Sequence, residues 1–268
     1  MVANPSIDKA RTEVTALMLM EAHEIGERFL PFAKERGISD VDAAYRVQDA
    51  YARRLMAAGN TQPGGFKIGL TTKKMQEMCG IDSPVSGYVA ANRIMTAPAT
   101  VDAMEYTHLG LEFEVAVKLG RDLPFRPLPY SQEEVARDAL VAAGIELVDD
   151  RNADYATLEA LSLIADNSWN AGIVVGAWQE PPADLAGIEA TILCNDQLVD
   201  RGHGRDALGH PFIPLTWLAN FRARTERPLK QGDIILTGNL IRTQFPTEPC
   251  KYRYELAGLG AVEVDVKF

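Results

Sequence analysis

The stretch Leu111–Val117 constrains the fold of this chain more than any other part of the sequence. It is short, apolar and β-prone, and yet it carries two carboxylates, Glu112 and Glu114, two positions apart. On a strand, residues two apart point to the same face, so both carboxylates share one face while the apolar side chains take the other. A face with two adjacent carboxylates is costly to bury unless something compensates its charge.

A second strand-like run, Gly144–Val148, carries a third carboxylate at its centre, Glu146. A hard divalent cation is the simplest partner for three carboxylates, because such cations prefer oxygen ligands. The alternative is that Glu112 and Glu114 lie on the solvated face of an edge strand, which is common in antiparallel sheets. Glu146 weakens this alternative without removing it.

Composition limits the classes of function that remain. The chain has 268 residues, enough for one large or two modest domains, with 47% hydrophobic and 24% charged residues, as in an ordinary soluble globular protein. Its formal net charge is −10, and its basic residues form scattered pairs rather than a sustained stripe. We therefore expect a small-molecule partner and no nucleic acid.

The cysteines and the hydropathy pattern bear on the compartment. Cys79, Cys194 and Cys250 are odd in number, far apart and free of any C-x-x-C motif. This pattern favours a reducing cytoplasm without a disulfide framework, and it excludes a thiolate metal site. The apolar run 16–20 is too short for a signal peptide, and no run is long enough to cross a membrane. We expect a cytoplasmic protein with no membrane partner.

Two regions are expected, an N-terminal helical region at 1–62 and a β-rich core at 63–268. In the first, apolar residues recur at helical spacing from Val14 onward, Pro31 disturbs or ends the helix, and Ser39–Asp42 starts a second helix. In the second, strands do not alternate regularly with helices, so a doubly wound parallel sheet is disfavoured and an α+β class is predicted. The expected strands are 66–70, 110–119, 143–149, 170–177, 187–194, 233–238, 250–257 and 260–267, and the expected helices are 72–78, 131–142, 157–164 and 214–225.

Polar residues near strand ends supply further candidates. Lys67 lies between two apolar residues of a short strand, so its side chain faces away from theirs, either to solvent or into a site. His108 directly precedes the glutamate strand and could assist there, or be an ordinary turn histidine. Asp166–Asn167 and Thr237–Gly238 lie where polar residues meet apolar strands, and sites are often built at such positions. The sequence contains no G-x-G-x-x-G, no phosphate-binding P-loop, no G-x-S-x-G and no H-x-x-x-H motif.

Taken in order, these segments resemble the fumarylacetoacetate hydrolase superfamily. They are most similar to its 2-keto-4-pentenoate hydratase / 4-oxalocrotonate decarboxylase branch (2-oxohept-3-enedioate hydratase-like) of aromatic meta-cleavage catabolism. The resemblance covers nearly the whole chain and rests on the segments 44–48, 67–71, 75–76, 112–116, 145–149, 165–167, 170–172, 208–211, 217–219, 232–238 and 258–260.

The resemblance implies a fold, a cofactor and a set of site residues. It implies a core of the β-sandwich-like roll type, a homo-oligomer and a Mg²⁺ or Mn²⁺ ion held by Glu112, Glu114 and Glu146. It implies Lys67 as a catalytic residue that supports a developing enolate oxygen, a role in which its positive charge is useful. The residues expected to bind substrate are Leu70, Arg93, Asp166, Asn167, Thr237 and Gly238.

The activity implied is a hydratase, which adds water to a 2-hydroxy-2,4-dienoate, or its 2-oxo tautomer, and gives a 4-hydroxy-2-oxo acid. A decarboxylase of a 2-oxo-dienedioate uses the same enolate stabilisation and is the first alternative. Hydrolysis of an acylpyruvate C–C bond is the second. A catalytically weak partner subunit that associates with a pathway enzyme is the alternative outside catalysis.

The sequence departs from the family at one place. After the glycine that corresponds to Gly87, relatives commonly carry one or two aspartates thought to transfer protons, whereas the segment 88–93 here contains no acid. An asparagine cannot act as a general base. The proton step then falls to Asp82, Glu105, His108 or a metal-bound water, or the reaction differs. Arg93 could pair with the second carboxylate of a dioate, or be a solvated loop arginine.

Overall fold

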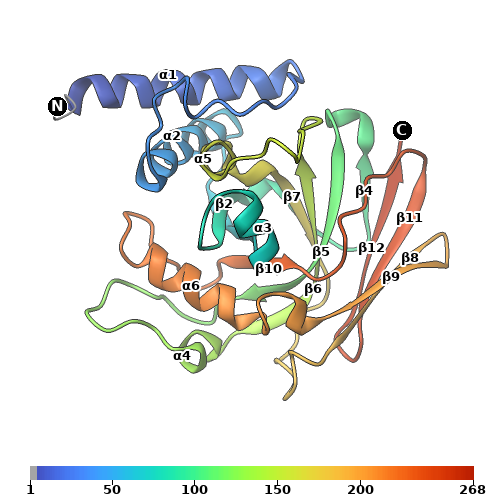
Figure 1. Cartoon of the computed structure of the whole chain (residues 1–268). Helices are drawn as coiled ribbons and strands as arrows, with labels where there is room; N and C mark the ends of the chain where they lie inside the picture. Colours follow the sequence, from blue (N-terminus) through green and yellow to red (C-terminus); the bar gives the residue numbers. More distant parts are fainter. Residues whose placement is uncertain (1–4) are drawn as a thin grey trace.

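The computed structural model describes residues 5–268, and its first part is helical, as predicted. Helix α1 spans Pro5–Glu24 and α2 spans Val41–Ala58. The side chain of Asp40 accepts a hydrogen bond from the backbone N–H of Ala43 and so caps α2 at the predicted start. Helix α1 ends at Glu24, before the proline expected to disturb it, and an irregular segment then leads to α2. Figure 1 shows the two helices stacked at one end of the molecule.

The larger sheet has seven strands in the order β2-β1-β10-β5-β6-β7-β3. It is mixed, because β1 pairs with β10 and β3 with β7 in parallel while the other neighbours are antiparallel. The sheet curls into a half-barrel (Figure 1). Its strands are β1 (Pro63–Gly69), β2 (Val85–Ala90), β3 (Ile94–Thr96), β5 (Leu109–Lys118), β6 (Leu140–Asp149), β7 (Asn170–Val175) and β10 (Ile234–Asn239).

A second sheet of five strands, in the order β4-β12-β11-β8-β9, packs against the first. Its strands are β4 (Ala99–Asp102), β8 (Glu189–Cys194), β9 (Gln197–His203), β11 (Cys250–Leu256) and β12 (Gly260–Lys267). The two sheets enclose the main core, in which Phe113 and Val115 from β5 join Tyr254 and Val264 from the second sheet. The apolar face of the glutamate strand is therefore buried, and the predicted α+β class with a β-rich core is confirmed.

Short helices fill the remaining connections. They are α3 (Lys73–Met78), α4 (Gln132–Ala136), α5 (Ala160–Ala165) and α6 (Phe212–Arg222), with single turns η1 (Ala91–Arg93), η2 (Ala103–Glu105), η3 (Asn167–Trp169) and η4 (Gly204–Asp206). A second hydrophobic cluster joins Leu19 of α1 and Tyr45 of α2 to Leu70, Val148 and Trp169 of the core. The helical region thus packs on the open side of the curled sheet.

The predicted helix at 131–142 was wrong in extent. Helix α4 is little more than one turn, closed by a capping box between Ser131 and Glu134, and β6 begins at Leu140. The run from Leu140 to Gly144 pairs residue by residue with β5, with Ala142 opposite Ala116. Tertiary pairing has overridden the helical preference of an alanine-rich run. Strands β2, β3, β4 and β9 were not predicted, because they are short or carry polar residues.

The expectation that the cysteines form no disulfide was wrong. Strands β8 and β11 are neighbours, and Cys194 and Cys250 at their ends are joined by a disulfide with Cα atoms 6.0 Å apart. A separation of 56 residues in the sequence hid this proximity. Cys79 is free and buried.

Among the described helices, none combines the length and the apolar character that a membrane crossing requires.

Candidate metal centre

Strand pairing brings the three glutamates together. Glu112 lies directly opposite Glu146 in the β5–β6 register, and Glu114 lies opposite Gly144. One oxygen from each glutamate lies within 4.8 Å of the others. Glu114 and Glu146 are fully buried, whereas Glu112 is partly exposed. The prediction that these carboxylates share one face is confirmed, and the solvated edge-strand alternative is wrong, because β5 is a central strand.

A neutral donor holds one oxygen of each buried carboxylate, and no neutral donor within residues 5–268 holds the other. Glu114 accepts a hydrogen bond from the N–H of Gly238 (2.5 Å), and Glu146 accepts one from the side-chain amide of Asn170 (2.9 Å). Of the second oxygens, Glu114 Oε1 has no hydrogen-bond donor among the described residues, and Glu146 Oε2 has only the Lys67 ammonium beside it, at 3.2 Å. Glu112 accepts a hydrogen bond from the Thr243 hydroxyl (3.1 Å).

Burial makes this group of negative charges costly. Burial raises the pKa of Glu146 to about 7, and burial together with the charges of Glu146 and Glu112 raises the pKa of Glu114 well above its usual value. The positive charge of Lys67 opposes both shifts. One buried carboxylate oxygen has no partner in the described part of the chain, and a second is paired only with Lys67. A set of oxygen donors in this state fits a hard divalent cation, whose charge would offset the repulsion.

Lys67 is buried beside the carboxylates rather than exposed. It lies on β1, and its ammonium is 3.2 Å from Glu146 Oε2 and donates a hydrogen bond to the carbonyl of Ser168 (3.2 Å). Burial alone would lower the pKa of Lys67, but the three glutamates outweigh burial and raise it. Lys67 therefore stays protonated and positively charged within the site.

The carbonyl that Lys67 contacts belongs to a strained turn. Asn167, Ser168 and Trp169 all have left-handed backbones, with φ of 52°, 49° and 61°. The side chain of Asn167 holds the turn by bonding the N–H and the C=O of Tyr88 (2.7 and 2.9 Å). Three consecutive non-glycine residues in this region cost free energy, and such strain is typical of functional sites.

Asp166 supports the same turn from behind. It is fully buried and pairs with His23 (2.7 Å) and Arg151 (2.5 Å). Burial alone would raise the pKa of Asp166, but these two partners outweigh burial and lower it. Asp166 and Asn167 were predicted to bind substrate, and in the structure their side chains are engaged with the protein and do not line the cavity at the glutamates.

A cavity of about 640 Å³ opens beside the glutamates. Lys67, Glu112 and Asn239 form its polar end, and Arg242 and Phe245 from the β10–β11 loop also line it. Leu70, predicted as a substrate-binding residue, lies in its wall. The rest of that wall is largely apolar, formed by Met75, Val85, Val148, Leu158, Leu163 and Trp169.

Three other residues predicted for the site, Gly238, Thr237 and Asp82, do not line this cavity. Gly238 reaches the site through its N–H to Glu114, but the Thr237 hydroxyl is buried and donates to the carbonyl of Val115 (2.9 Å). Asp82 is exposed in the turn after α3 and does not line the cavity. Sequence reasoning did not assign Asn170, Thr243 or Arg242. The polar run before β7 was a signal that could have indicated Asn170. No sequence pattern indicates Thr243 or Arg242.

His108 lies next to the cavity rather than in it. Its Nδ1 is 2.7 Å from Asp150 Oδ1, and its ring stacks on Phe245 with centroids 4.6 Å apart. Tyr155, which lines the cavity, donates a hydrogen bond from its hydroxyl to Asp150 Oδ2 (3.0 Å). His108, Asp150 and Tyr155 thus form a hydrogen-bonded chain that ends at the cavity.

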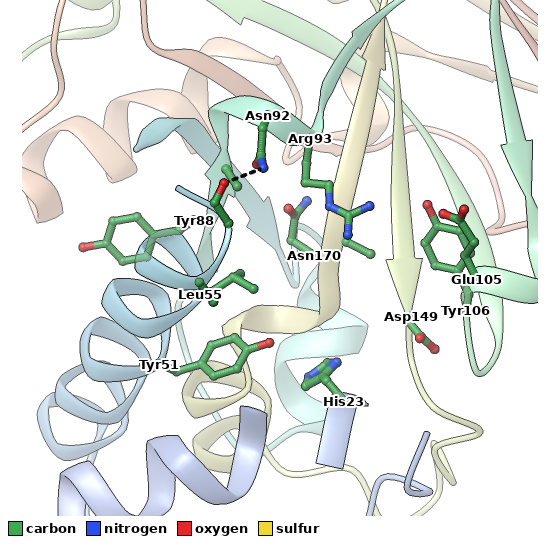
Figure 2. A pocket seen from close by; sticks show the side chains of 14 residues that line it. His23, Tyr51, Leu55, Tyr88, Asn92, Arg93, Glu105, Tyr106, Asp149 and Asn170 are labelled. Atoms are coloured by element: carbon green, nitrogen blue, oxygen red, sulfur yellow. Dashed lines mark hydrogen bonds between the residues drawn. The ribbon is translucent and has the colours of Figure 1, made fainter. Parts of the chain in front are cut away.

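Arg93 and Asn92 line a different cavity, which Figure 2 shows. The segment 88–93, in which no acid is present, runs along that second cavity. Of the described residues, the β2 side chain that lines the cavity at the glutamates is Val85. The absence of an acid at 88–93 therefore removes no group from the carboxylate cavity itself.

Comparisons with known proteins agree with this geometry. The sequence model described as fumarylacetoacetate (FAA) hydrolase C-terminal matches residues 47–267. The chain is 33% identical to 2-keto-4-pentenoate hydratase 1 of Dechloromonas aromatica, over 94% of this chain and 95% of that protein. It is 31% identical to the TodF product hydratase of Pseudomonas putida, over 96% of both chains.

A solved structure shows the same fold. The 4-oxalocrotonate decarboxylase from Pseudomonas putida G7, complexed with magnesium and adipate, superposes with a TM-score of 0.87 at 22% identity. The match covers 96% of this chain and 97% of that one.

Proposed function

The chain belongs to the fumarylacetoacetate hydrolase family, and from this premise we propose that it is a divalent-metal-dependent hydratase. As a hydro-lyase it adds water to a 2-hydroxy-2,4-dienoate, or its 2-oxo tautomer, and gives a 4-hydroxy-2-oxo acid of aromatic meta-cleavage catabolism. The observation that carries this proposal is the cluster of three glutamates and Lys67 beside an apolar cavity, in a chain about as long as the hydratases it is similar to.

We assign the metal to Glu112, Glu114 and Glu146, and propose Mg²⁺ or Mn²⁺ because all donors at the site are oxygens. When bound, such an ion acts as a Lewis acid toward the carboxylate and the 2-oxygen of the substrate. Asn170, Gly238 and Thr243 each donate a hydrogen bond to one of these glutamates, which aims the remaining oxygens at a common centre. The carboxylates thereby fix where the acid end of the substrate lies.

Lys67 is assigned to charge stabilisation at the 2-oxygen. Its ammonium is held between Glu146 and the carbonyl of Ser168, so it does not have to reorganise as negative charge develops. The left-handed turn at Asn167–Trp169 serves as its support. Leu70 lies in the wall of the cavity, and Gly238 reaches the metal site through its N–H to Glu114, whereas the buried Thr237 acts only by holding the strand through its bond to Val115.

The proton step at the far end of the substrate is assigned to the chain of His108, Asp150 and Tyr155. The Tyr155 hydroxyl meets the cavity, and Asp150 connects it to the imidazole. Burial and then the charge of Asp150 raise the pKa of Tyr155, so the phenol stays protonated and can relay a proton rather than hold a charge. Of the other candidates, Asp82 lies on an exposed turn and Glu105 lines the other cavity, while a metal-bound water remains an alternative.

The wall of the cavity favours a substrate with an uncharged tail. Away from Lys67 and Glu112, most of the wall is formed by aliphatic, methionine and aromatic side chains, with Asp206 and Arg242 as its charged residues. A free carboxylate against such a surface would lose hydration without gaining a partner. This supports hydration of a short 2-hydroxydienoate over reactions of a dioate.

One residue favours a second candidate, decarboxylation of a 2-oxo-dienedioate. Apart from Lys67, Arg242 is the one lysine or arginine among the described residues that line the cavity, and it is exposed. A distal carboxylate that reached the β10–β11 loop would meet its guanidinium. Replacing Arg242 by Gln should then weaken the binding of the dioate and leave the binding of the mono-acid unchanged.

The test is incubation with 2-hydroxypenta-2,4-dienoate and, separately, with a 2-oxo-dienedioate, each with Mg²⁺. The hydratase proposal expects loss of ultraviolet absorbance with the first substrate and no CO₂. Loss of absorbance only with the dioate, together with CO₂ release, would establish the decarboxylase instead. No reaction with either substrate would favour the acylpyruvate hydrolase or the catalytically weak partner subunit.

Assembly and location complete the proposal. We propose a homo-oligomer, with hetero-association with a pathway enzyme as its extension, because α1 exposes Val14 and Leu17 at 57% and 51%. Light scattering of the purified chain would test this. We also propose a cytoplasmic location, in which cellular reductants would act against the Cys194–Cys250 disulfide and keep both cysteines reduced. Thiol titration of protein taken directly from cells would show whether they are.

A further inference from the structure

A second cavity of about 410 Å³ lies apart from the glutamates, and the proposed reaction makes no use of it. It is bounded by the end of α1, one face of α2, the turn η1 and the start of β7. Figure 2 shows Arg93 near its centre, with Tyr51 and His23 at the side of the helices. The volume lies in the range of small-molecule sites, roughly 300–1,000 Å³.

The lining includes an exposed arginine, Arg93, whose side chain is unpaired within the part of the chain that the structure describes. The Arg93 guanidinium points into it (Figure 2) and makes no hydrogen bond or ion pair of its side chain with any described residue. His23, the other basic residue in the lining, already contacts Asp166 at 2.7 Å. Arg93 is therefore the charge left to act on a ligand.

Two acids also line the cavity, and neither forms an ion pair with Arg93. The carboxylate of Asp149 accepts hydrogen bonds from three backbone N–H groups, at 2.9, 2.9 and 3.2 Å, which occupy both of its oxygens. Glu105 is exposed and lies beside Tyr106, on the opposite side of β7 from the Arg93 backbone (Figure 2). The Arg93 guanidinium is therefore free to pair with the anionic group of a ligand.

Two polar groups add directional contacts next to Arg93. Tyr51 is 4% exposed, its hydroxyl points into the cavity (Figure 2), and it has no hydrogen-bond partner within residues 5–268. A buried phenol hydroxyl normally finds a partner, so this one is available to a ligand. Asn170 donates its amide N–H to Glu146, which leaves its carbonyl oxygen free on the cavity side.

Part of the lining is apolar. Leu55, Ala90 and Ala171 contribute hydrocarbon, and the ring of Tyr51 adds an aromatic surface. One guanidinium suits a single carboxylate head, and the apolar wall suits a compact organic body. Inorganic phosphate could pair with the Arg93 guanidinium, but it would leave the apolar side chains of the cavity exposed to water.

We propose that this second cavity is a binding site for a small organic monocarboxylate. The carboxylate pairs with Arg93, the organic body packs against Leu55 and the Tyr51 ring, and a second polar group bonds the Tyr51 hydroxyl or the Asn170 carbonyl. Since the same Asn170 side chain holds Glu146, an occupant of this site contacts a residue that positions the metal centre.

Benzoate is the probe, because it has a single carboxylate and an apolar ring and lacks the 2-oxygen needed for chelation. Calorimetry and ligand-observed NMR on metal-free protein should give saturable binding of one benzoate per chain, in the millimolar range or tighter. Arg93→Gln should weaken it by about tenfold to a hundredfold, the effect of losing a charge-assisted hydrogen bond. Tyr51→Phe should leave it nearly unchanged, because benzoate keeps the Tyr51 ring contact and has no second polar group for the Tyr51 hydroxyl.

Arg242→Gln is the matched control, because it makes the same change of charge in the cavity at the glutamates. It should leave benzoate binding unchanged. The proposal is overturned if binding is lost in Arg242→Gln but kept in Arg93→Gln, if no saturable binding occurs, or if inorganic phosphate binds as tightly. None of these readouts depends on turnover, so they stand whether or not the hydratase proposal holds.

Discussion

Glu114 shows at the scale of one residue why the site needs a cation. Its carboxylate is fully buried, one oxygen accepts the N–H of Gly238, and the other oxygen has no donor among the described residues. An isolated carboxylate in this environment takes up a proton or finds a positive partner. Lys67 pairs with Glu146, and its single positive charge cannot balance three carboxylates. A second positive charge is therefore needed for all three glutamates to be ionised.

The first prediction concerns this carboxylate. Glu114→Gln should abolish Mg²⁺ binding and turnover, because an amide supplies no charge and competes poorly for the cation. Calorimetric titration with Mg²⁺ checks this, with circular dichroism to confirm folding. Glu189→Gln on the exposed face of β8 is the control. Full Mg²⁺-dependent turnover in Glu114→Gln would exclude the three-carboxylate assignment.

The second prediction separates Lys67 from the ligands. Lys67→Ala should lower kcat by about 10²- to 10³-fold, the usual effect of removing a preorganised charge-stabilising donor. Mg²⁺ affinity should change far less, because Lys67 contacts Glu146 without being a ligand itself. An unchanged kcat would mean that Lys67 is only structural.

The third prediction follows from the pKa of Glu146, which burial raises to about 7 in the metal-free protein. A glutamate in the unfolded chain titrates near 4.3, so between these values the native state holds more protons and a rise in pH lowers the free energy of unfolding. Mg²⁺ needs the ionised carboxylate. The Mg²⁺-induced rise in Tm should therefore be larger at about pH 8 than at about pH 5. Equal shifts at both would contradict the assignment.

At the scale of elements, the end of β10 positions the site through a glycine. Gly238 has φ of +110°, and a Cβ there would lie 2.3 Å from the Thr71 hydroxyl. Its N–H is also the donor to Glu114. The strand therefore requires a glycine at this position, both for the backbone conformation and for the space.

The fourth prediction uses this constraint. Gly238→Ala should cost more than about 2 kcal/mol of unfolding free energy and also weaken Mg²⁺ binding, because the strand end must shift. Gly232→Ala is the matched control, since Gly232 has φ of +86° and a Cβ there meets no atom within 4 Å. It should cost about 1–2 kcal/mol and leave Mg²⁺ affinity intact. Thermal unfolding with and without Mg²⁺ measures both effects, and an unaltered Mg²⁺ affinity in Gly238→Ala would contradict this role.

The sequence predicted the strands that carry the glutamates, because each is a short apolar run whose carboxylates occupy alternate positions and so point to one face. It could not predict the turn at Asn167–Trp169, whose left-handed backbone depends on Asn167 bonding Tyr88, 79 residues away. The β10–β11 loop, which supplies Thr243 and Arg242, has no periodicity to read. The run after Ser131 was misassigned because local propensity and strand pairing disagree there.

At the scale of the whole molecule, Arg222 ties the helical region to the core. It is buried on α6, donates to the hydroxyl of Tyr88 (3.0 Å) and to Gln48 of α2 (3.3 Å), and lies 4.4 Å from the centroid of the Phe66 ring. These contacts join three parts of the chain that are distant in sequence. We therefore expect residues 1–62 and 63–268 to unfold together, although their boundaries were predicted as separate regions.

The fifth prediction is that Arg222→Met lowers the free energy of unfolding by about 2–4 kcal/mol, because it leaves buried polar partners unpaired. Arg224→Met, two residues further along and exposed, is the control and should stay within about 0.5 kcal/mol. Helical circular dichroism and tryptophan fluorescence should report one transition. Two separate transitions in the unmodified protein would show independent domains.

The most direct measurement of the central claim is turnover of 2-hydroxypenta-2,4-dienoate by protein stripped of metal and then titrated with Mg²⁺. The arrangement of the three glutamates predicts no turnover without metal, saturation at one ion per chain, and a 4-hydroxy-2-oxo acid as product without release of CO₂. The same rate in the stripped protein, with no response to Mg²⁺ or Mn²⁺, would contradict the account.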